Sequence, residues 1–367
     1  MGKSTLLNAL LSDDLAIATS RPQTTRHAIL GVLTTEHTQL CLTDTPGIIG
    51  SPAYRLQEGM MDAVKGAVRN ADVYLVVTDV YSGYEKNNDD GTTKENDETS
   101  SLDETMGIGE EVLHKLQQSH HPVIICINKV DLAIPKEERK TRSDVENAFV
   151  AYNNTPVQAL QTIEKWRAVL PDAFAIIPTC AANGPDDPGV VAIRSILLAN
   201  DPSSDVGNAI RGLGRPVPGM FRENTNMISN DEAKEILPIG PPLYHPDFFT
   251  DRTDRFCASE LIRETLFTSL GKELPYCCEV RIETFDESKR DDERKAVIRI
   301  EATILVERDS QKGIVVGKGG TKIKDVGIKS RYHLQEFFGT KIFLDLRVKV
   351  DKNWRNNSDQ LKKFGYM

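Results

Sequence analysis

The chain has 367 residues, enough for two or three domains, and 39% of them are hydrophobic, which is sufficient for packed cores. Its formal net charge of −9 excludes a protein that binds nucleic acid over its whole surface. The 6 cysteines show no Cys-x-x-Cys spacing and no histidine partners, so we expect reduced thiols and no structural zinc. No apolar run is long enough to span a membrane, and we recognise no signal or transit segment.

The first residues, Met1-Gly2-Lys3-Ser4-Thr5, match the second half of a phosphate-binding loop, Gly-x-x-x-x-Gly-Lys-Ser. In such a loop the lysine neutralises the β- and γ-phosphates and the serine hydroxyl binds Mg²⁺. A helix, here expected from residue 4 to about residue 11, directs its N-terminus at the phosphates. In this sequence the motif begins near its second glycine, without the first glycine, the rest of the loop or the strand that normally precedes the loop. We therefore expect an N-terminally truncated chain, from which a targeting segment could also be missing.

A polar stretch broken by proline, residues 20–27, lies where a GTPase carries a switch loop. A threonine hydroxyl in such a loop joins the Mg²⁺ shell only when a γ-phosphate is present, so the loop orders with GTP and relaxes with GDP. We assign this role to Thr25, with Thr24 as the alternative. The simpler reading of the stretch is a plain threonine-rich turn.

The motif Asp44-x-x-Gly47 follows residues 38–42, whose alternation predicts a strand. The Asp44 carboxylate can reach a phosphate-bound Mg²⁺ through water, and the Gly47 N–H can donate to the γ-phosphate. Ile48 and Ile49 come next, where Ras-type switches have a glutamine that orients the attacking water. We therefore expect slow intrinsic hydrolysis, with the water held by another group or by a partner, and assign no catalytic residue.

The motif Asn128-Lys129-Val130-Asp131 follows an apolar run typical of a buried parallel strand. The Asp131 carboxylate can accept both N–H donors on the guanine edge, Asn128 assists this recognition, and Lys129 packs along the base. In the small-residue loop that contains Cys180 and Ala181, a backbone N–H can lie beneath the guanine oxygen. Together the motifs predict a GTP-binding domain with GTP or GDP as ligand, although each alone could be an ordinary turn at a strand end.

The remaining elements of this domain are predicted from apolar periodicity. We expect helices at residues 54–70, 109–117 and 190–198, strands at 73–77 and 175–177, and charged helices within 135–170. Residues 79–105 have an acidic and polar composition that predicts a disordered surface insertion. Residues 201–245, rich in Gly, Pro, Asn and Ser, are interpreted as a linker or insertion with a short helix near 231–237.

A second unit is expected over residues 246–367. Its predicted elements are a helix at 250–270, strands at 277–285 and 295–307, a helix at 321–338 and a strand at 341–349. From residue 312 onward there are 13 Lys and Arg against 5 Asp and Glu, a local net charge of +8 that leaves −17 for the rest. This asymmetry predicts a basic module joined to an acidic body.

The loop Gly317-Lys318-Gly319-Gly320 precedes the helix at 321–338 and is the signature loop of a KH module. Its glycines allow close approach of a nucleic-acid backbone, while Lys318, Lys322 and Lys324 neutralise phosphate. An apolar groove beside such a loop accepts about four unstacked bases. The alternative is an ordinary glycine turn between helices.

The whole pattern resembles the Era family, GTPases that join a G domain to a C-terminal KH domain of the type II arrangement. The most specific stretches are Pro22-Gln23-Thr24-Thr25-Arg26-His27, Asp251-Arg252-Thr253-Asp254-Arg255-Phe256, Glu273-Leu274-Pro275-Tyr276 and Ile304-Leu305-Val306-Glu307-Arg308. The resemblance implies an α/β, Rossmann-like P-loop G domain over residues 1–200, lacking its first strand, and an α+β type II KH domain over 246–367. It also implies Mg²⁺-dependent GTP hydrolysis, GTP-promoted binding near the 3′ end of small-subunit rRNA, and a role in assembling the small ribosomal subunit.

Two other functions stay open at this point. The first is an RNA-binding KH protein whose truncated G domain no longer binds or hydrolyses nucleotide. The second is a GTPase whose KH-like domain docks a protein. We expect a monomer in the cytoplasm or, from the insertions around Asp89 and Gly207, in a mitochondrion or chloroplast.

Overall fold

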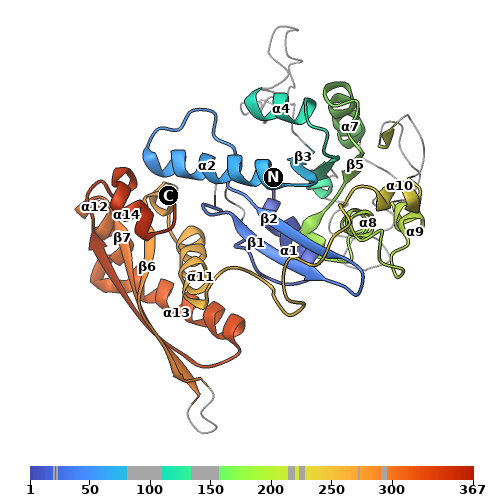
Figure 1. Cartoon of the computed structure of the whole chain (residues 1–367). Helices are drawn as coiled ribbons and strands as arrows, with labels where there is room; N and C mark the ends of the chain where they lie inside the picture. The colour runs from blue at the N-terminus through green and yellow to red at the C-terminus, as the bar shows by residue number, and fades with distance from the viewer. Residues whose placement is uncertain are drawn as a thin grey trace. The chain divides into compact units, whose positions relative to one another are not determined.

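The computed structural model describes the chain except residues 20, 22–23, 81–109, 134–156, 214–219, 223–227, 272 and 291–295. The described residues pack as two units (Figure 1). The first comprises residues 1–16, 30–50 and 64–250, and the second comprises residues 17–29, 51–63 and 251–367. Most of the expected acidic insertion, and the first part of the expected charged helices at 135–170, lie outside the described residues.

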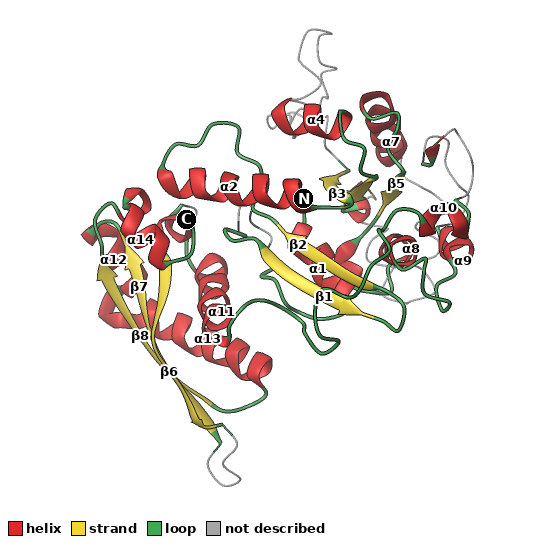
Figure 2. Cartoon of the chain, in the orientation of Figure 1, coloured by secondary structure: helices red, strands yellow, loops and turns green. Residues whose placement is uncertain are grey.

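The described elements before residue 250 are a mixture of helices and strands (Figure 2). They are α1 (Lys3–Leu11), β1 (Ile29–Thr34), β2 (Gln39–Asp44), α2 (Arg55–Asn70), β3 (Tyr74–Asp79), α4 (Glu110–Gln117), β4 (Val123–Asn128), α7 (Val157–Val169), β5 (Ala175–Pro178), α8 (Pro188–Leu197), α9 (Val206–Gly212) and α10 (Asn230–Lys234). Short 3-10 turns follow β4 at Val130–Ala133 and β5 at Ala181–Asn183. The predicted helices and strands are confirmed where the chain is described, with shifts of a few residues at their ends.

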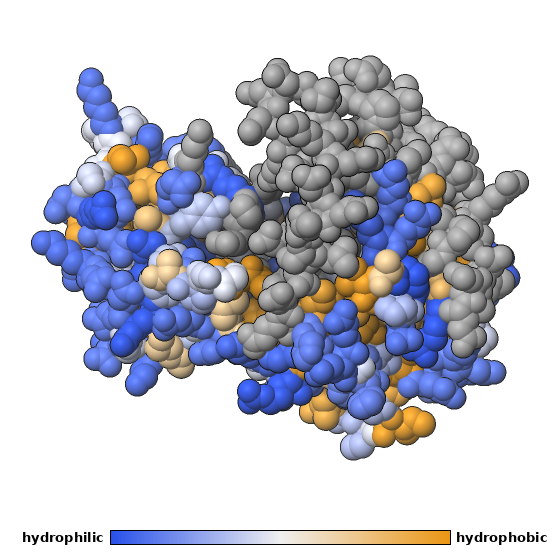
Figure 3. Space-filling model, turned by 90° about the horizontal axis from the view of Figure 1, so that it is seen from above, coloured by the Kyte–Doolittle hydropathy of each residue, from blue (hydrophilic) through white to orange (hydrophobic). Residues whose placement is uncertain are grey.

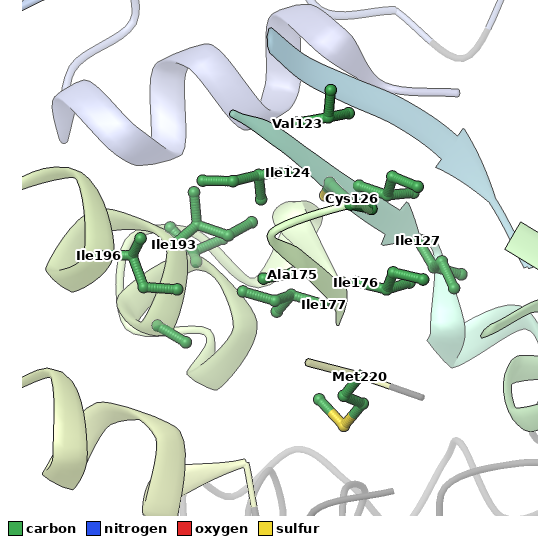
Figure 4. Packing of buried hydrophobic residues seen from close by; sticks show 14 of the residues in the cluster. Val123, Ile124, Cys126, Ile127, Ala175, Ile176, Ile177, Ile193, Ile196 and Met220 are labelled. Atoms are coloured by element: carbon green, nitrogen blue, oxygen red, sulfur yellow. The ribbon is translucent and has the colours of Figure 1, made fainter. Parts of the chain in front are cut away.

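The strand β4 is the centre of the first unit. It pairs in parallel with β3 on one side and β5 on the other, with Ile125 opposite Val76 and Ile176. Every residue of β4 is buried, as an apolar strand covered on both faces requires. Figure 4 shows Ile193 and Ile196 of α8 on the same side of this sheet as Ile124 and Ile177. The carboxyl ends of three parallel strands therefore share one edge, where polar side chains gather.

Helix α8 closes this core and has a well-defined start. The Asp187 side chain accepts hydrogen bonds from the N–H groups of Gly189 and Val190, and Pro188 occupies the first turn. A Cβ at Gly189 would lie 2.1 Å from the Pro178 carbonyl oxygen. Only glycine therefore allows α8 to approach the end of β5 this closely.

The strand β1 was not predicted from the sequence. It pairs with β2 in a two-stranded sheet, and the turn between them is closed by the Thr35 N–H donating to the Thr38 carbonyl at 2.8 Å. Over the described residues this pair is not hydrogen-bonded to the sheet of β3, β4 and β5. The Val32 N–H donates to the Phe249 carbonyl at 2.8 Å, so a late segment of the unit borders β1.

The described residues between 201 and 245 include several that pack into the core of the first unit. Val206 and Ile210 of α9, and Phe221 and Ile228 after it, belong to the same buried cluster as β4 and β5. Helix α10 begins with a reciprocal capping box between Ser229 and Glu232. Of the two interpretations of this segment, linker or insertion, the packing favours an insertion.

From residue 251 onward, the described part of the second unit contains one helix, two strands, two helices and one strand, followed by a C-terminal segment. Its elements are α11 (Asp254–Ser269), β6 (Glu279–Lys289), β7 (Val297–Val306), α12 (Asp309–Val316), α13 (Thr321–Phe338), β8 (Ile342–Val350) and α14 (Ser358–Lys363), with 3-10 turns at Leu274–Cys277, Lys318–Gly320 and Trp354–Asn356. The predicted elements occur in the predicted order, and the structure adds helix α12 before the glycine loop.

The core of the second unit lies between one face of its sheet and its helices. β7 pairs antiparallel with β6 and in parallel with β8, with Ile300 opposite Leu344. Alternate residues of β7, including Ile298 and Ile304, are fully buried, and they pack with Leu266 of α11. The burial of alternate residues places one face of β7 in this core, as expected for a strand covered by helices on that face.

The visible face in Figure 3 is dominated by hydrophilic side chains over the described residues, with hydrophobic ones in small groups. Among the helices that the structure describes, none combines the length and the apolar character needed to cross a bilayer.

Candidate functional site

Ser4 and Asp44 come together at one edge of the first unit. Ser4 lies in the first turn of α1, and Asp44 is the last residue of β2. Both are buried, and the Ser4 hydroxyl donates to Asp44 Oδ2 at 2.6 Å. This contact joins two residues that are 40 positions apart and that the sequence motifs assign to the same ion.

The pair fits a magnesium ion by its chemistry. A hydroxyl and a carboxylate are oxygen ligands of the kind that Mg²⁺ prefers, and Mg²⁺ is usually bound by one or two protein ligands together with phosphate oxygens and water. Among the described residues, no group of three or more His, Cys, Asp and Glu side chains is placed to hold a metal. Ser4 and Asp44 therefore suit an ion that arrives with a nucleotide.

Gly2 and Lys3 form the start of α1 beside this pair. Gly2 has a φ of 86°, and its carbonyl accepts the first helical bond from the Leu6 N–H at 3.0 Å. A Cβ at Gly2 would lie 2.5 Å from Asn128 Nδ2, so glycine is required here. Burial lowers the pKa of Lys3, while Asp44 acts in the opposite direction. A bound phosphate would stabilise the charge of this partly desolvated ammonium.

Asn128 connects the start of the chain to the loop after β5. Its Nδ2 donates to the Met1 carbonyl at 2.9 Å, and its Oδ1 accepts from the Ala181 N–H at 3.0 Å. The Thr179 hydroxyl also donates to Oδ1, at 3.4 Å. The side chain is buried, so these bonds fix its orientation. The sequence predicted a role for Asn128 toward the base but not this structural role between two loops.

Asp131 and Cys180 meet on the other side of the same loops. The Cys180 thiol donates to Asp131 Oδ1 at 3.2 Å. Burial and then the charge of Asp131 raise the pKa of Cys180, so the thiol stays protonated and remains a donor. Lys129, between the two recognition residues, has a φ of 61°, an uncommon conformation for a residue with a side chain. The structure therefore brings together Asn128, Asp131, Cys180 and Ala181, as predicted from their motifs.

The other predicted residues of this site are placed as follows. Thr5 is half-buried in the first turn of α1, and Gly47 lies in the loop three residues after Asp44. Thr24 and Thr25 are buried and belong by packing to the second unit. The Thr24 hydroxyl donates to the Arg21 carbonyl at 2.9 Å.

The predicted RNA-binding residues surround the turn between α12 and α13. Gly317, Gly319 and Gly320 have φ values of 73°, 61° and 78°, in the region that favours glycine. A Cβ at Gly317 would lie 3.0 Å from the Lys322 backbone nitrogen, whereas no heavy atom lies within 4 Å of a Cβ at Gly319. The outer side of the turn at Gly319 is therefore open to an approaching backbone.

Three exposed lysines lie at this turn and in the first part of α13: Lys318, Lys322 and Lys324. The first turn of α13 has no acidic residue, although acidic side chains usually stabilise a helix N-terminus. Positive side chains beside free N–H groups suit a phosphate group. A cavity of about 140 Å³, lined by Ser269, Leu270, Thr321, Lys322, Asp325 and Val326, adjoins the same end of α13.

Two family models match the chain. A model described as a 50S ribosome-binding GTPase matches residues 1–129, and a KH domain model matches residues 273–355. Among curated proteins, GTPase Era of Xylella fastidiosa strain M12 is 31% identical over 366 residues, covering 100% of this chain and 93% of the relative. GTPase Era of Thermoanaerobacter sp. strain X514 is 30% identical over 368 residues, covering 100% and 92%.

Solved structures show the same fold. An Aquifex aeolicus Era variant bound to GDP and AlF4− superposes with a TM-score of 0.68 at 24% identity, covering 99% of this chain and 94% of that one. Era in complex with MgGDPNP and nucleotides 1506–1542 of 16S ribosomal RNA gives a TM-score of 0.67 at 24% identity, covering 100% and 94%. The fold is therefore a P-loop GTPase domain followed by a KH domain.

Proposed function

Because the chain belongs to the Era family of GTPases, we propose that it binds and hydrolyses GTP and uses the bound nucleotide to control binding of ribosomal RNA. The observation that carries the nucleotide part is the convergence of Ser4 with Asp44 and of Asn128 with Ala181. Residues for the metal, the phosphates and the base come from loops at the ends of α1, β2, β4 and β5. This is the arrangement in which α/β sheets bind nucleotides.

The nucleotide-binding residues have separate roles in this proposal. Lys3 neutralises phosphate charge, and the N–H groups of Gly2, Thr5 and Gly47 lie along the phosphates. Asn128 and Asp131 recognise the guanine edge, and Lys129 packs along the base. Cys180 positions the Asp131 carboxylate through its thiol, and the Ala181 N–H lies near the guanine oxygen. The hydrogen bonds of Asn128 and Cys180 support this assignment because they hold both base-reading residues in place.

Ser4 and Thr25 hold Mg²⁺ in the GTP state, and Asp44 binds it through water. Ser4, Thr25 and Asp44 would hold the ion, which would supply positive charge to stabilise the phosphates as the phosphoryl group moves to water. Ile48 and Ile49 follow Gly47, so no glutamine orients the water at this point. Slow intrinsic hydrolysis is the consequence, and the switch stays in its GTP state until another group or partner supplies the missing orientation.

The RNA partner is proposed to be small-subunit rRNA near its 3′ end. The complex of Era with nucleotides 1506–1542 of 16S rRNA supports this choice. In the present chain, Gly317, Lys318, Gly319 and Gly320 bind the RNA backbone, and Lys322 and Lys324 add phosphate contacts. The protein acts as a monomer on the small ribosomal subunit during its assembly, in the cytoplasm or in a ribosome-containing organelle.

A hydrolysis assay tests the enzymatic part of the proposal. The Ser4→Ala variant is expected to hydrolyse GTP more than about tenfold more slowly than the wild-type chain, because it lacks a metal ligand. Phosphate release is measured in a Mg²⁺ titration. The matched control is Ser119→Ala, which removes a hydroxyl from a turn in the same unit. Equal rates for Ser4→Ala and the control would contradict the assigned metal site.

A further inference from the structure

The segment just before β1 is anchored by a buried cluster of the second unit. Arg26 is 3% exposed, and its Nη1 donates to Glu279 Oε2 at 3.0 Å and to the Cys278 carbonyl at 2.9 Å. Its Nη2 donates to the carbonyls of Tyr276 at 3.0 Å and Pro275 at 3.3 Å. One guanidinium thus binds three carbonyls in the turn before β6 and the carboxylate of the first residue of β6. A buried cation with this many partners is strongly fixed, because leaving any partner unsatisfied is costly.

The penultimate residue of the chain completes the cluster. The Tyr366 hydroxyl donates to the same Glu279 Oε2 at 2.8 Å, and burial raises its pKa, so it remains a donor. The His27 ring stacks on Tyr366 with centroids 4.2 Å apart and meets the edge of Phe256 at 5.2 Å. Burial lowers the pKa of His27 to about 4, so its ring contributes stacking as a neutral group.

Two further arginines hold the same segment on the N-terminal side of Thr25. Arg263 Nη1 donates to the Thr24 carbonyl at 2.6 Å, and the same guanidinium is paired with Glu260. Arg21 Nη2 donates to the Leu270 carbonyl at 2.8 Å, and Leu270 lines the cavity beside Lys322. The segment is therefore bonded to α11 and to the turn before β6, within the packed unit that carries the glycine loop.

This anchoring has a consequence for the switch. Thr25 is the residue proposed to bind Mg²⁺ only in the GTP state, and its Cα is within about 3.8 Å of the Arg26 Cα through one peptide bond. Movement of Thr25 must either carry the anchored unit along or break the Arg26 contacts. A buried ion pair with several partners is either formed or broken, and this all-or-none contact suits a two-state switch.

We propose that Arg26, Glu279 and Tyr366 form a latch that couples the switch segment to the RNA-binding unit, so that the effect of nucleotide on RNA affinity passes through this cluster. The inference rests on the proposed function, and it adds the residues that carry the coupling. By linkage, RNA that favours one state of the latch changes nucleotide affinity by the same factor.

The test measures the coupling itself. Dissociation constants for an RNA fragment with the 3′-terminal small-subunit rRNA sequence are determined by filter binding, with saturating GDP and with a non-hydrolysable GTP analogue. The ratio compared is the dissociation constant with GDP divided by the one with the GTP analogue. For the wild-type chain this ratio is expected to be at least about 5. In Arg26→Met and Glu279→Gln it is expected to fall to within about twofold of one, while each variant still binds both ligands.

Two additional variants make the result specific. Tyr366→Phe removes only one hydroxyl from the cluster and is expected to reduce the ratio partly. This variant tests the latch independently of whether Arg26→Met folds. Arg281→Met breaks an exposed ion pair with Glu283 in the same unit and should leave the ratio unchanged. The proposed latch is wrong if the wild-type chain binds both ligands and Glu279→Gln and Tyr366→Phe have the wild-type ratio. It is also wrong if the wild-type ratio is one. A wild-type chain that binds no GTP analogue would overturn the proposed function as well.

Discussion

Replacing Asp131 with Asn is expected to weaken GTP binding by about 100-fold or more. The carboxylate accepts two hydrogen bonds from the N1–H and the exocyclic amine of guanine. Hydrogen bonds to a charged group contribute about 1.5–3 kcal/mol each, so losing two corresponds to about 3–6 kcal/mol, or about 100- to 20,000-fold in affinity. An amide at this position offers one acceptor and one donor, and its donor faces another donor on guanine.

The same change should create a new preference. Xanthine carries a carbonyl where guanine carries its amine, so the Asn amide can donate to it. We expect Asp131→Asn to bind xanthosine triphosphate better than GTP, measured by competition with a fluorescent nucleotide. Asp172→Asn makes the same chemical change at an exposed site of the same unit and serves as the control. If Asp131→Asn binds GTP as tightly as this control does, the assignment of Asp131 to the base is wrong.

Replacing Gly319 with Asp is expected to reduce RNA affinity on the order of 10- to 100-fold. Gly319 is exposed with a φ of 61°, and no heavy atom lies within 4 Å of an added Cβ. Asp tolerates this backbone conformation better than most residues do, so the unit should still fold. The new carboxylate occupies the side from which the RNA phosphates approach and opposes Lys318 and Lys322.

Gly319→Asn separates charge from bulk in this experiment, because Asn has the same size and conformational tolerance without the charge. We expect Gly319→Asn to reduce RNA affinity less than Gly319→Asp does. The difference between the two variants should shrink as the salt concentration is raised, because salt screens the repulsion. Gly317→Asp is a poorer test, because a Cβ there would lie 2.8 Å from Lys322 Cγ. Equal RNA affinities for the wild-type chain and Gly319→Asp would mean that RNA does not bind at this loop.

Local sequence patterns were sufficient for the elements and motifs that depend on neighbouring residues. The continuous apolar run of β4 predicted a strand buried on both faces, and all six of its residues are buried. The polar residues after it lie at the edge of the sheet because parallel strands end together. The meeting of Ser4 with Asp44 followed from the same reasoning, although it joins two distant segments.

Features set by distant contacts could not be predicted in this way. Strand β1 includes Gly31 and lacks a regular alternation, and its pairing with β2 gives it a stable place. The polar composition of residues 201–245 obscured Val206 and Phe221, which are almost fully buried. Nothing local to Arg26 indicates a partner 253 positions away at Glu279. Such contacts come from tertiary packing, which secondary-structure propensity and hydrophobic periodicity do not encode.

The most direct test of the account is a titration of the chain with a fluorescent GDP analogue in the presence of Mg²⁺. We expect saturable binding that GTP and GDP displace and that ATP at the same concentration does not. We also expect that removing Mg²⁺ weakens competition by GTP, because Ser4 and Asp44 then have no ion to hold. A chain that folds and binds RNA but shows no saturable binding of the analogue would contradict the central claim that these residues form a guanine-nucleotide site.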